Sequence, residues 1–169
     1  QQMKNPAEKI LRLNEALSWR KELRVKSCSL AVTNGCFDIL HRGHASYLYE
    51  ASLKADSLLV LVNSDASVRR VKGENRPIID EDDRAYMLAS LESVSAVVLF
   101  DTTDCTGQLQ AIEPDVYVKG GDYTPETLVQ EEYKLLKAMG VRIELIPPVA
   151  GLSTSALIER ILARPRPER

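Results

Sequence analysis

Residues 30–44 read LAVTNGCFDILHRGH, and this stretch decides the expected fold. Its first four residues, Leu30 to Thr33, form a short apolar and β-branched run of the kind that makes a buried strand. Gly35 then permits a tight turn, and a helical pattern starts at Ala45. A strand that passes through a turn into a helix is the unit from which parallel α/β sheets are built.

The same alternation continues along the chain, because further apolar runs are separated by longer stretches with helical periodicity. The predicted strands are Leu30 to Thr33, Leu58 to Asn63, Ala96 to Phe100, Val116 to Lys119 and Arg142 to Ile146. The predicted helices are Pro6 to Glu22, Ala45 to Lys54, Glu81 to Leu91, Thr106 to Ile112, Pro125 to Met139 and Thr154 to Leu162. We therefore expect an α/β fold with a Rossmann-like, doubly wound, five-stranded parallel sheet and helices on both faces.

Composition narrows the classes of partner. Of the 169 residues, 44% are hydrophobic, which is enough for a core without disulfide or metal staples. The net charge of -2 comes from 22 basic and 24 acidic residues spread along the chain, so nucleic acid is not an expected partner.

No apolar run approaches the roughly 20 residues that cross a bilayer. The three cysteines form no C-x-x-C pair. We expect a soluble, cytoplasmic protein with reduced thiols, no membrane partner and no protein-held metal.

Two histidines, His41 and His44, stand three residues apart just before the predicted helix Ala45 to Lys54. At that spacing both side chains lie on one face of a helical turn. Free backbone N–H groups and the positive end of the helix dipole favour an anion at such a position. Gly43, between the histidines, leaves room for a ligand to approach the backbone. The segment therefore predicts a phosphate-binding site.

The sequence HRGH at residues 41–44, after NGCFD at residues 34–38, resembles the H-x-G-H signature of the cytidylyltransferase-like nucleotidyltransferase superfamily. In those enzymes the two histidines contact the triphosphate and stabilise charge on the α-phosphoryl group, which implies the same catalytic role for His41 and His44. The resemblance also implies that the surrounding segment binds the nucleotide. Its candidate contacts are Thr33, Asn34, Gly35, Cys36, Phe37 and Gly43.

Polar residues also follow the second predicted strand. A basic stretch, VRRVKG at residues 68–73, is interpreted as a loop, and a lysine in a mobile loop can close over phosphates. Lys72 is the candidate, because the wider sequence resembles the heptose-phosphate branch of the superfamily. Lys72 thus becomes the third candidate catalytic residue, and the candidate acceptor-binding residues are Asp38, Asn63, Asp65 and Arg76.

Two later segments extend the resemblance. KGGDY at residues 119–123 follows the fourth predicted strand, and in similar enzymes this loop lies beside the nucleotide and the acceptor. GLSTS at residues 151–155 alone would be only a helix N-cap, but it resembles the G-x-S-T-[ST] segment that holds the β- and γ-phosphates. The implied nucleotide contacts are Lys119, Gly120, Gly121, Asp122, Ser153, Thr154 and Ser155. Cytidylyltransferases often carry an arginine just before this segment. The chain has PPVA at residues 147–150 instead, and Arg76 or Lys119 is expected to compensate.

Taken together, the motifs most resemble the D-glycero-β-D-manno-heptose 1-phosphate adenylyltransferases, over about residues 30–162. This resemblance implies transfer of AMP from ATP, with Mg²⁺, to the sugar phosphate, a step in lipopolysaccharide precursor synthesis. It also divides the chain into an N-terminal helical extension (1–26), a nucleotidyltransferase domain (27–163) and a flexible tail (164–169). Homodimers are common in similar enzymes, so a homodimer is the expected state.

Several alternatives stay open on the sequence. A cytidylyltransferase or an FAD synthetase-like enzyme with another phosphorylated acceptor would use the same scaffold, and a non-catalytic module would bind a nucleotide without turnover. Asp38 either orients a histidine or contacts the ligand. Arg84 either reaches the site or is a surface helix charge, and Arg69 and Arg70 either join the phosphate loop or form a solvated charge run.

Overall fold

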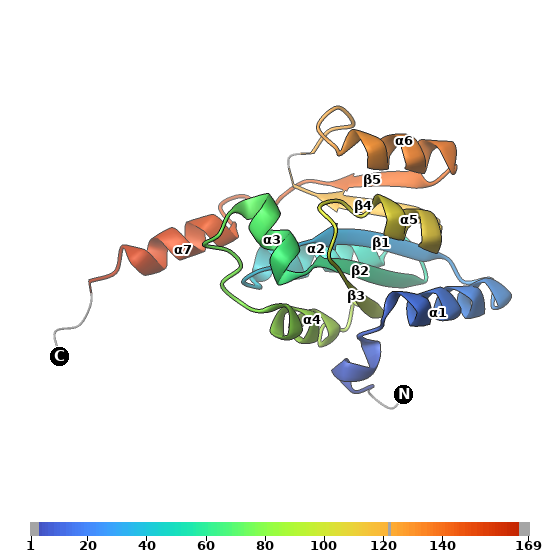
Figure 1. Ribbon diagram of the computed structural model, residues 1–169, viewed down its shortest axis with the longest axis horizontal. Coiled ribbons are helices and arrows are strands. Elements are labelled where there is room, and N and C mark those ends of the chain that lie inside the picture. The colour runs from blue at the N-terminus through green and yellow to red at the C-terminus, as the bar shows by residue number, and fades with distance from the viewer. Residues whose placement is uncertain (1–3, 122, 166–169) are drawn as a thin grey trace.

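The computed structural model describes residues 4–121 and 123–165, and five parallel strands form its centre (Figure 1). The order across the sheet is β3-β2-β1-β4-β5. The strands are β1 (Leu30–Gly35), β2 (Ser57–Asn63), β3 (Ala96–Phe100), β4 (Val116–Gly120) and β5 (Arg142–Ile146). All four strand pairings are parallel. The α/β class and the strand positions predicted from the sequence are thereby confirmed.

Helices pack on both faces of the sheet, as expected for a doubly wound fold. One face carries α1 (Leu13–Val25), α5 (Thr106–Ile112) and α6 (Gln130–Ala138). The other face carries α2 (Arg42–Ser52) and α4 (Glu81–Ala89). The remaining helices are a 3-10 turn, η1 (Pro6–Lys9), with α3 (Asp65–Lys72) and α7 (Thr154–Leu162).

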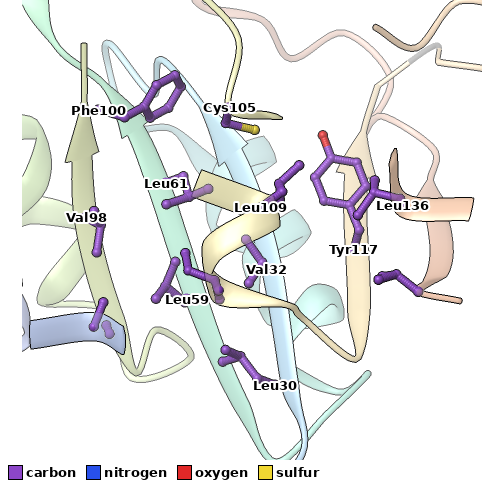
Figure 2. Close-up of a cluster of buried hydrophobic side chains, with 14 of the residues drawn as sticks. Leu30, Val32, Leu59, Leu61, Val98, Phe100, Cys105, Leu109, Tyr117 and Leu136 are labelled. Carbon is purple, nitrogen blue, oxygen red and sulfur yellow. The ribbon is translucent and has the colours of Figure 1, made fainter. Parts of the chain in front are cut away.

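The core consists of two apolar clusters, one on each face of the sheet. Because alternate residues of a strand point to opposite faces, Leu30 and Val32 of β1 pack with Leu109 of α5 and Leu136 of α6 (Figure 2). Ala31, between them, packs in the other cluster with α2 and α4. Residues of β1 therefore belong to both core clusters, and the histidine segment directly follows this central, buried strand.

The N-terminal segment differs from the expectation. A single helix over Pro6 to Glu22 is wrong, because η1 ends at Lys9 and α1 begins only at Leu13. Between them, Ile10 forms an isolated parallel bridge with Val97 of β3. Helix α1 packs on the sheet, since its residues Ala16 and Leu23 belong to the core.

Two further differences concern α3 and α6. Residues 65–72, interpreted from the sequence as a basic loop, form the helix α3, and Ser64 caps it by accepting a hydrogen bond from the Ser67 N–H. The helix predicted from Pro125 begins at Gln130 instead. A turn precedes it, in which the Thr127 N–H donates to the Thr124 carbonyl.

The C-terminal helix α7 extends away from the body of the molecule (Figure 1) and buries none of its residues. Ile161 and Leu162 near its end are 57% and 78% exposed. Of the predicted tail 164–169, residues 166–169 lie outside the described residues. No helix in the described ranges 4–121 and 123–165 combines the length and the apolar character needed to cross a membrane.

Candidate active site

The candidate site lies at the carboxyl edge of the sheet, around the end of β1. The chain runs outward from β1 through β2 to β3 and then continues with β4 on the other side of β1. Strand order therefore reverses beside β1, and in open α/β sheets ligands bind at such a point. The histidine segment follows β1, and Lys119 lies near the end of β4 on the neighbouring strand.

The two histidines form a stacked pair at the start of α2. His41 is the N-cap of this helix, and its Nδ1 accepts a hydrogen bond from the Gly43 N–H at 3.0 Å. The ring centroids of His41 and His44 lie 3.9 Å apart, and Phe37 packs edge-on against His44 at 5.4 Å. The Gly43 position explains the H-x-G-H spacing, because a Cβ there would lie 2.8 Å from the His41 ring.

Burial lowers the pKa of His44 to about 4, with the neighbouring His41 as the next cause, and burial also lowers the pKa of His41. Both imidazoles are therefore neutral near pH 7, and each carries one N–H donor. Two of their nitrogen atoms, His41 Nε2 and His44 Nδ1, are buried without a hydrogen-bond partner among the described residues. Because His41 Nδ1 accepts from Gly43, the free His41 Nε2 carries the N–H and is suited to donate to a phosphate oxygen at the N-terminus of α2. The His44 pKa is also affected by a hydrogen bond to the Ile39 backbone.

Lys119 supplies a positive charge on the other side of β1. Its Nζ donates to Asn34 Oδ1 at 2.9 Å and lies 5.0 Å from the centre of the Tyr123 ring. Next to it, Gly120 makes room for Tyr47, because a Cβ at this glycine would lie 2.6 Å from the tyrosine ring. Tyr47 of α2 donates a hydrogen bond to the Val118 carbonyl of β4 and shares a hydrogen bond with the Thr33 hydroxyl of β1. These two hydrogen bonds join β1, β4 and α2. Asp122, predicted to bind the nucleotide, lies outside the described residues.

The Ser-Thr-Ser segment at the start of α7 lies beside the histidine turn. Leu152 Cβ is 3.3 Å from the place that a Cβ on Gly43 would occupy. Ser153 is the N-cap of α7, and its hydroxyl accepts from the Ala156 N–H at 3.0 Å. Two helix N-terminal regions, those of α2 and α7, therefore approach each other here, as the prediction of a shared triphosphate site requires.

Arg84 has a structural role that the sequence did not reveal. Its interpretation as a surface helix charge is wrong, since only 1% of the residue is exposed. The guanidinium donates to three backbone carbonyls and one carboxylate, at 2.7 to 2.9 Å. These acceptors are the carbonyls of Cys36, Asn63 and Ile79 and the Asp65 carboxylate. A single side chain thus joins the ends of β1 and β2 to α3 and α4.

Asp38 also has internal partners. Its carboxylate accepts hydrogen bonds from the backbone N–H groups of Ile78 and Ile79 and from Arg76 Nε, the last at 2.6 Å. Burial acts to raise the pKa of Asp38, but these donors outweigh it and the pKa is lowered. The carboxylate therefore anchors residues 76–79 to the histidine segment. Acceptor binding by Asp38 and Arg76 stays a prediction.

The other residues predicted to bind the acceptor or the phosphates come from β2 and α3. Asn63 Nδ2 donates to Ser67 Oγ at 2.9 Å, and Asp65 pairs with Arg84 at 2.8 Å. Lys72 is exposed and is the last residue of α3. Gly73, with a φ of 98°, ends the helix directly after it. Arg70 bonds to Asp101, whereas Arg69 is exposed on the same helix. The roles of these residues in binding stay predictions.

Paired histidines at the end of a strand in a doubly wound sheet place this protein among the α/β proteins that bind ligands where the strand order reverses. The chain belongs to the cytidylyltransferase-like family, whose family model matches residues 32–160. This membership confirms the class of enzyme that the motifs predict, a nucleotidyltransferase.

Curated relatives carry a common name. The chain is 46% identical over 155 residues to the bifunctional protein HldE of Syntrophotalea carbinolica. The aligned region covers 91% of this chain and 31% of that protein. It is 50% identical over 131 residues to the bifunctional protein HldE of Citrifermentans bemidjiense, covering 78% of this chain and 26% of that protein. The chain therefore spans less than a third of the length of these relatives.

Two solved structures are similar to the chain. A lipopolysaccharide core biosynthesis protein from Thermoplasma volcanium matches with a TM-score of 0.59 and 29% identity, covering 72% of this chain and 97% of that one. A pantoate-beta-alanine ligase from Francisella tularensis, complexed with an ATP analogue and beta-alanine, matches with a TM-score of 0.59 at 15% identity, covering 92% of this chain and 79% of that one. The second likeness shows the shared fold alone.

Proposed function

We propose that this chain is an adenylyltransferase that joins AMP from MgATP to D-glycero-β-D-manno-heptose 1-phosphate, giving ADP-heptose and pyrophosphate. The observation that carries the proposal is the stacked pair His41 and His44 at the N-terminus of α2, with its two unpartnered nitrogens. The free N–H of His41 can stabilise charge that develops on the α-phosphoryl group in the transition state, with His44 stacked beside it.

The reaction places modest demands on the protein. The sugar phosphate is already an anionic nucleophile, so in-line attack on the α-phosphorus needs positioning and charge stabilisation and no strong general base. The bond from the sugar phosphate oxygen to the α-phosphorus forms as the bond to the pyrophosphate oxygen breaks. In the described ranges no three His, Cys, Asp or Glu side chains are grouped as metal ligands, and we treat Mg²⁺ as part of the MgATP substrate, held by phosphate oxygens.

The relatives support the choice of acceptor. The most similar proteins named above share one name, and the Thermoplasma volcanium protein is described by its role in lipopolysaccharide core biosynthesis. The motifs that resemble heptose-phosphate enzymes lie within the matched region 32–160. Homodimer formation is part of the same proposal, and light scattering of the purified chain tests it.

Pyrophosphate release tests the proposal. The chain is incubated with magnesium, heptose 1-phosphate and each of ATP, CTP, GTP and UTP in turn, with a His44→Ala variant as the matched control. Release with ATP alone, lost in the control, is the expected result. Release with CTP would assign the chain to the cytidylyltransferase branch instead. Nucleotide binding by calorimetry without release for any acceptor would support the non-catalytic alternative.

A further inference from the structure

A chain of polar groups runs from the half-buried Lys119 and Asn34 to the buried Tyr117 of β4 and the buried Glu132 of α6. Asn34 Oδ1, which accepts the Lys119 ammonium, also lies 2.9 Å from the Tyr117 hydroxyl. That hydroxyl lies 3.2 Å from Glu132 Oε2, so its single proton is shared between two acceptors. Figure 2 shows the Tyr117 side chain on the face of β4 that α5 and α6 cover, close to Cys105.

Glu132 is an unusual residue for the inside of an apolar cluster. It belongs to α6 and is 2% exposed, among neighbours such as Tyr117 at 1% and Cys105 at 0%. Its other oxygen, Oε1, accepts from the Cys105 N–H at 2.9 Å and lies 3.2 Å from the Cys105 thiol. Its hydrogen-bond partners in the described part of the chain are uncharged, and a buried carboxylate in such surroundings is costly unless a cation lies nearby.

The nearest such cation along this chain of contacts is Lys119. We propose that Glu132 is a positioning residue that acts through Tyr117 and Asn34 to hold the Lys119 ammonium at the carboxyl edge of β4, where it faces the anionic ligand. The part played by the ligand rests on the function proposed above. The link between Glu132 and Lys119 does not, because it is a property of the protein alone.

The electrostatics agree with this geometry. Burial lowers the pKa of Lys119, and the Glu132 carboxylate is the largest influence in the opposite direction. The other groups near the ammonium are the thiols of Cys105 and Cys36, whose own pKa values burial raises so that they stay uncharged, Lys72, which lowers the Lys119 pKa, and the Tyr123 ring. Without the carboxylate the balance moves toward the uncharged amine, which cannot pair with a phosphate.

A charge-removing variant tests the inference. Glu132→Gln keeps the size of the side chain and removes its charge; the amide oxygen can still accept from the Cys105 N–H, while the amide nitrogen would donate to the Tyr117 hydroxyl. Glu131→Gln, at the exposed neighbouring position of α6, is the matched control. The Lys119 side chain is titrated by NMR in ¹³C- and ¹⁵N-labelled full-length protein, and a thermal melt checks the fold. We expect a lower titration midpoint for Lys119 in Glu132→Gln only. An unchanged midpoint in folded Glu132→Gln would overturn the proposal.

A second variant decides the matter if Glu132→Gln does not fold. Tyr117→Phe removes the hydroxyl that links Glu132 to Asn34 and keeps the buried ring. We expect altered side-chain amide signals of Asn34 and a loss of MgATP affinity of roughly tenfold, since a hydrogen bond that orients a charged group is removed. Unchanged amide signals would overturn the proposal. Both NMR results are independent of turnover, so absence of ADP-heptose formation would count only against the proposed function.

Discussion

Replacing Arg84 by methionine should destabilise the protein more than any other single change at the edge of the sheet. The buried guanidinium satisfies the carbonyls of Cys36, Asn63 and Ile79 and the carboxylate of Asp65. Methionine fills much of the volume but donates no hydrogen bond, so four acceptors lose their partner. Breaking a buried charge network of this kind costs about 3–5 kcal/mol of the free energy of unfolding. For a domain of this size that loss lowers Tm by about 10 °C or more.

Urea denaturation followed by circular dichroism measures this loss directly. The control is Arg69→Met, the same substitution at an exposed position on α3, which should change the free energy of unfolding by less than about 0.5 kcal/mol. A loss below about 1 kcal/mol in Arg84→Met would refute the argument, because it would mean that the four acceptors find other donors or water without cost.

Three further predictions concern the histidine turn. His44→Ala should lower kcat for pyrophosphate release by roughly 10²–10³ without unfolding the protein, and near-normal turnover would remove His44 from the chemistry. Because the pKa of His44 is about 4 in the folded protein against 6.5 for an unperturbed histidine, protons bind the unfolded chain more readily between these values. The contribution of His44 to stability is therefore full above pH 6.5 and falls toward pH 4, by about 2 kcal/mol after allowance for solvent screening of the partly exposed ring. Urea titrations at pH 7 and 4.5 should show a loss in the parent protein that exceeds the loss in His44→Ala by this amount, since His41 and Asp38 still contribute in the variant. Gly43→Ala places a Cβ 2.8 Å from the His41 ring and should reduce kcat/KM about 10²-fold by displacing that ring. Gly107→Ala, where a Cβ meets nothing within 4 Å, should leave kcat/KM unchanged and serves as its control.

The strands β1, β2 and β3 were predictable because each is mostly an apolar run covered on both faces, a pattern that few other structures produce. β5 is a weaker case, since it carries Arg142 and Glu144 and none of its residues is buried. A helix after the histidine segment was predictable, but its start was not: it was expected at Ala45, whereas α2 begins at Arg42 with His41 as its N-cap.

The sequence also contained a signal for α3 that went unused. Ser64 is a good N-cap residue, and Val68 and Val71 follow at helical spacing.

The environments of the charged residues were less accessible to sequence reasoning. Arg84 and Asp38 draw their partners from segments that the sheet brings together, and no local pattern marks those partners in advance. Glu132 is a similar case, because an acidic residue in the first turn of a helix ordinarily faces water. Local pattern predicts where a helix or strand lies, whereas the burial of a charge depends on which other elements pack over it.

The central place of β1 and the exposure of α7 also determine how the amides of this protein exchange with solvent. β1 is hydrogen-bonded to strands on both sides and enclosed by both core clusters, so its amide protons should exchange only on global unfolding. The amides of α7, a helix without a buried residue, are released by local opening. The histidine turn is thus attached to a strand whose amides we expect to exchange slowly, and residues 153–155 begin a helix whose amides we expect to exchange fast. In the proposed phosphate site, we therefore expect the part contributed by α7 to open while the histidine turn keeps its geometry.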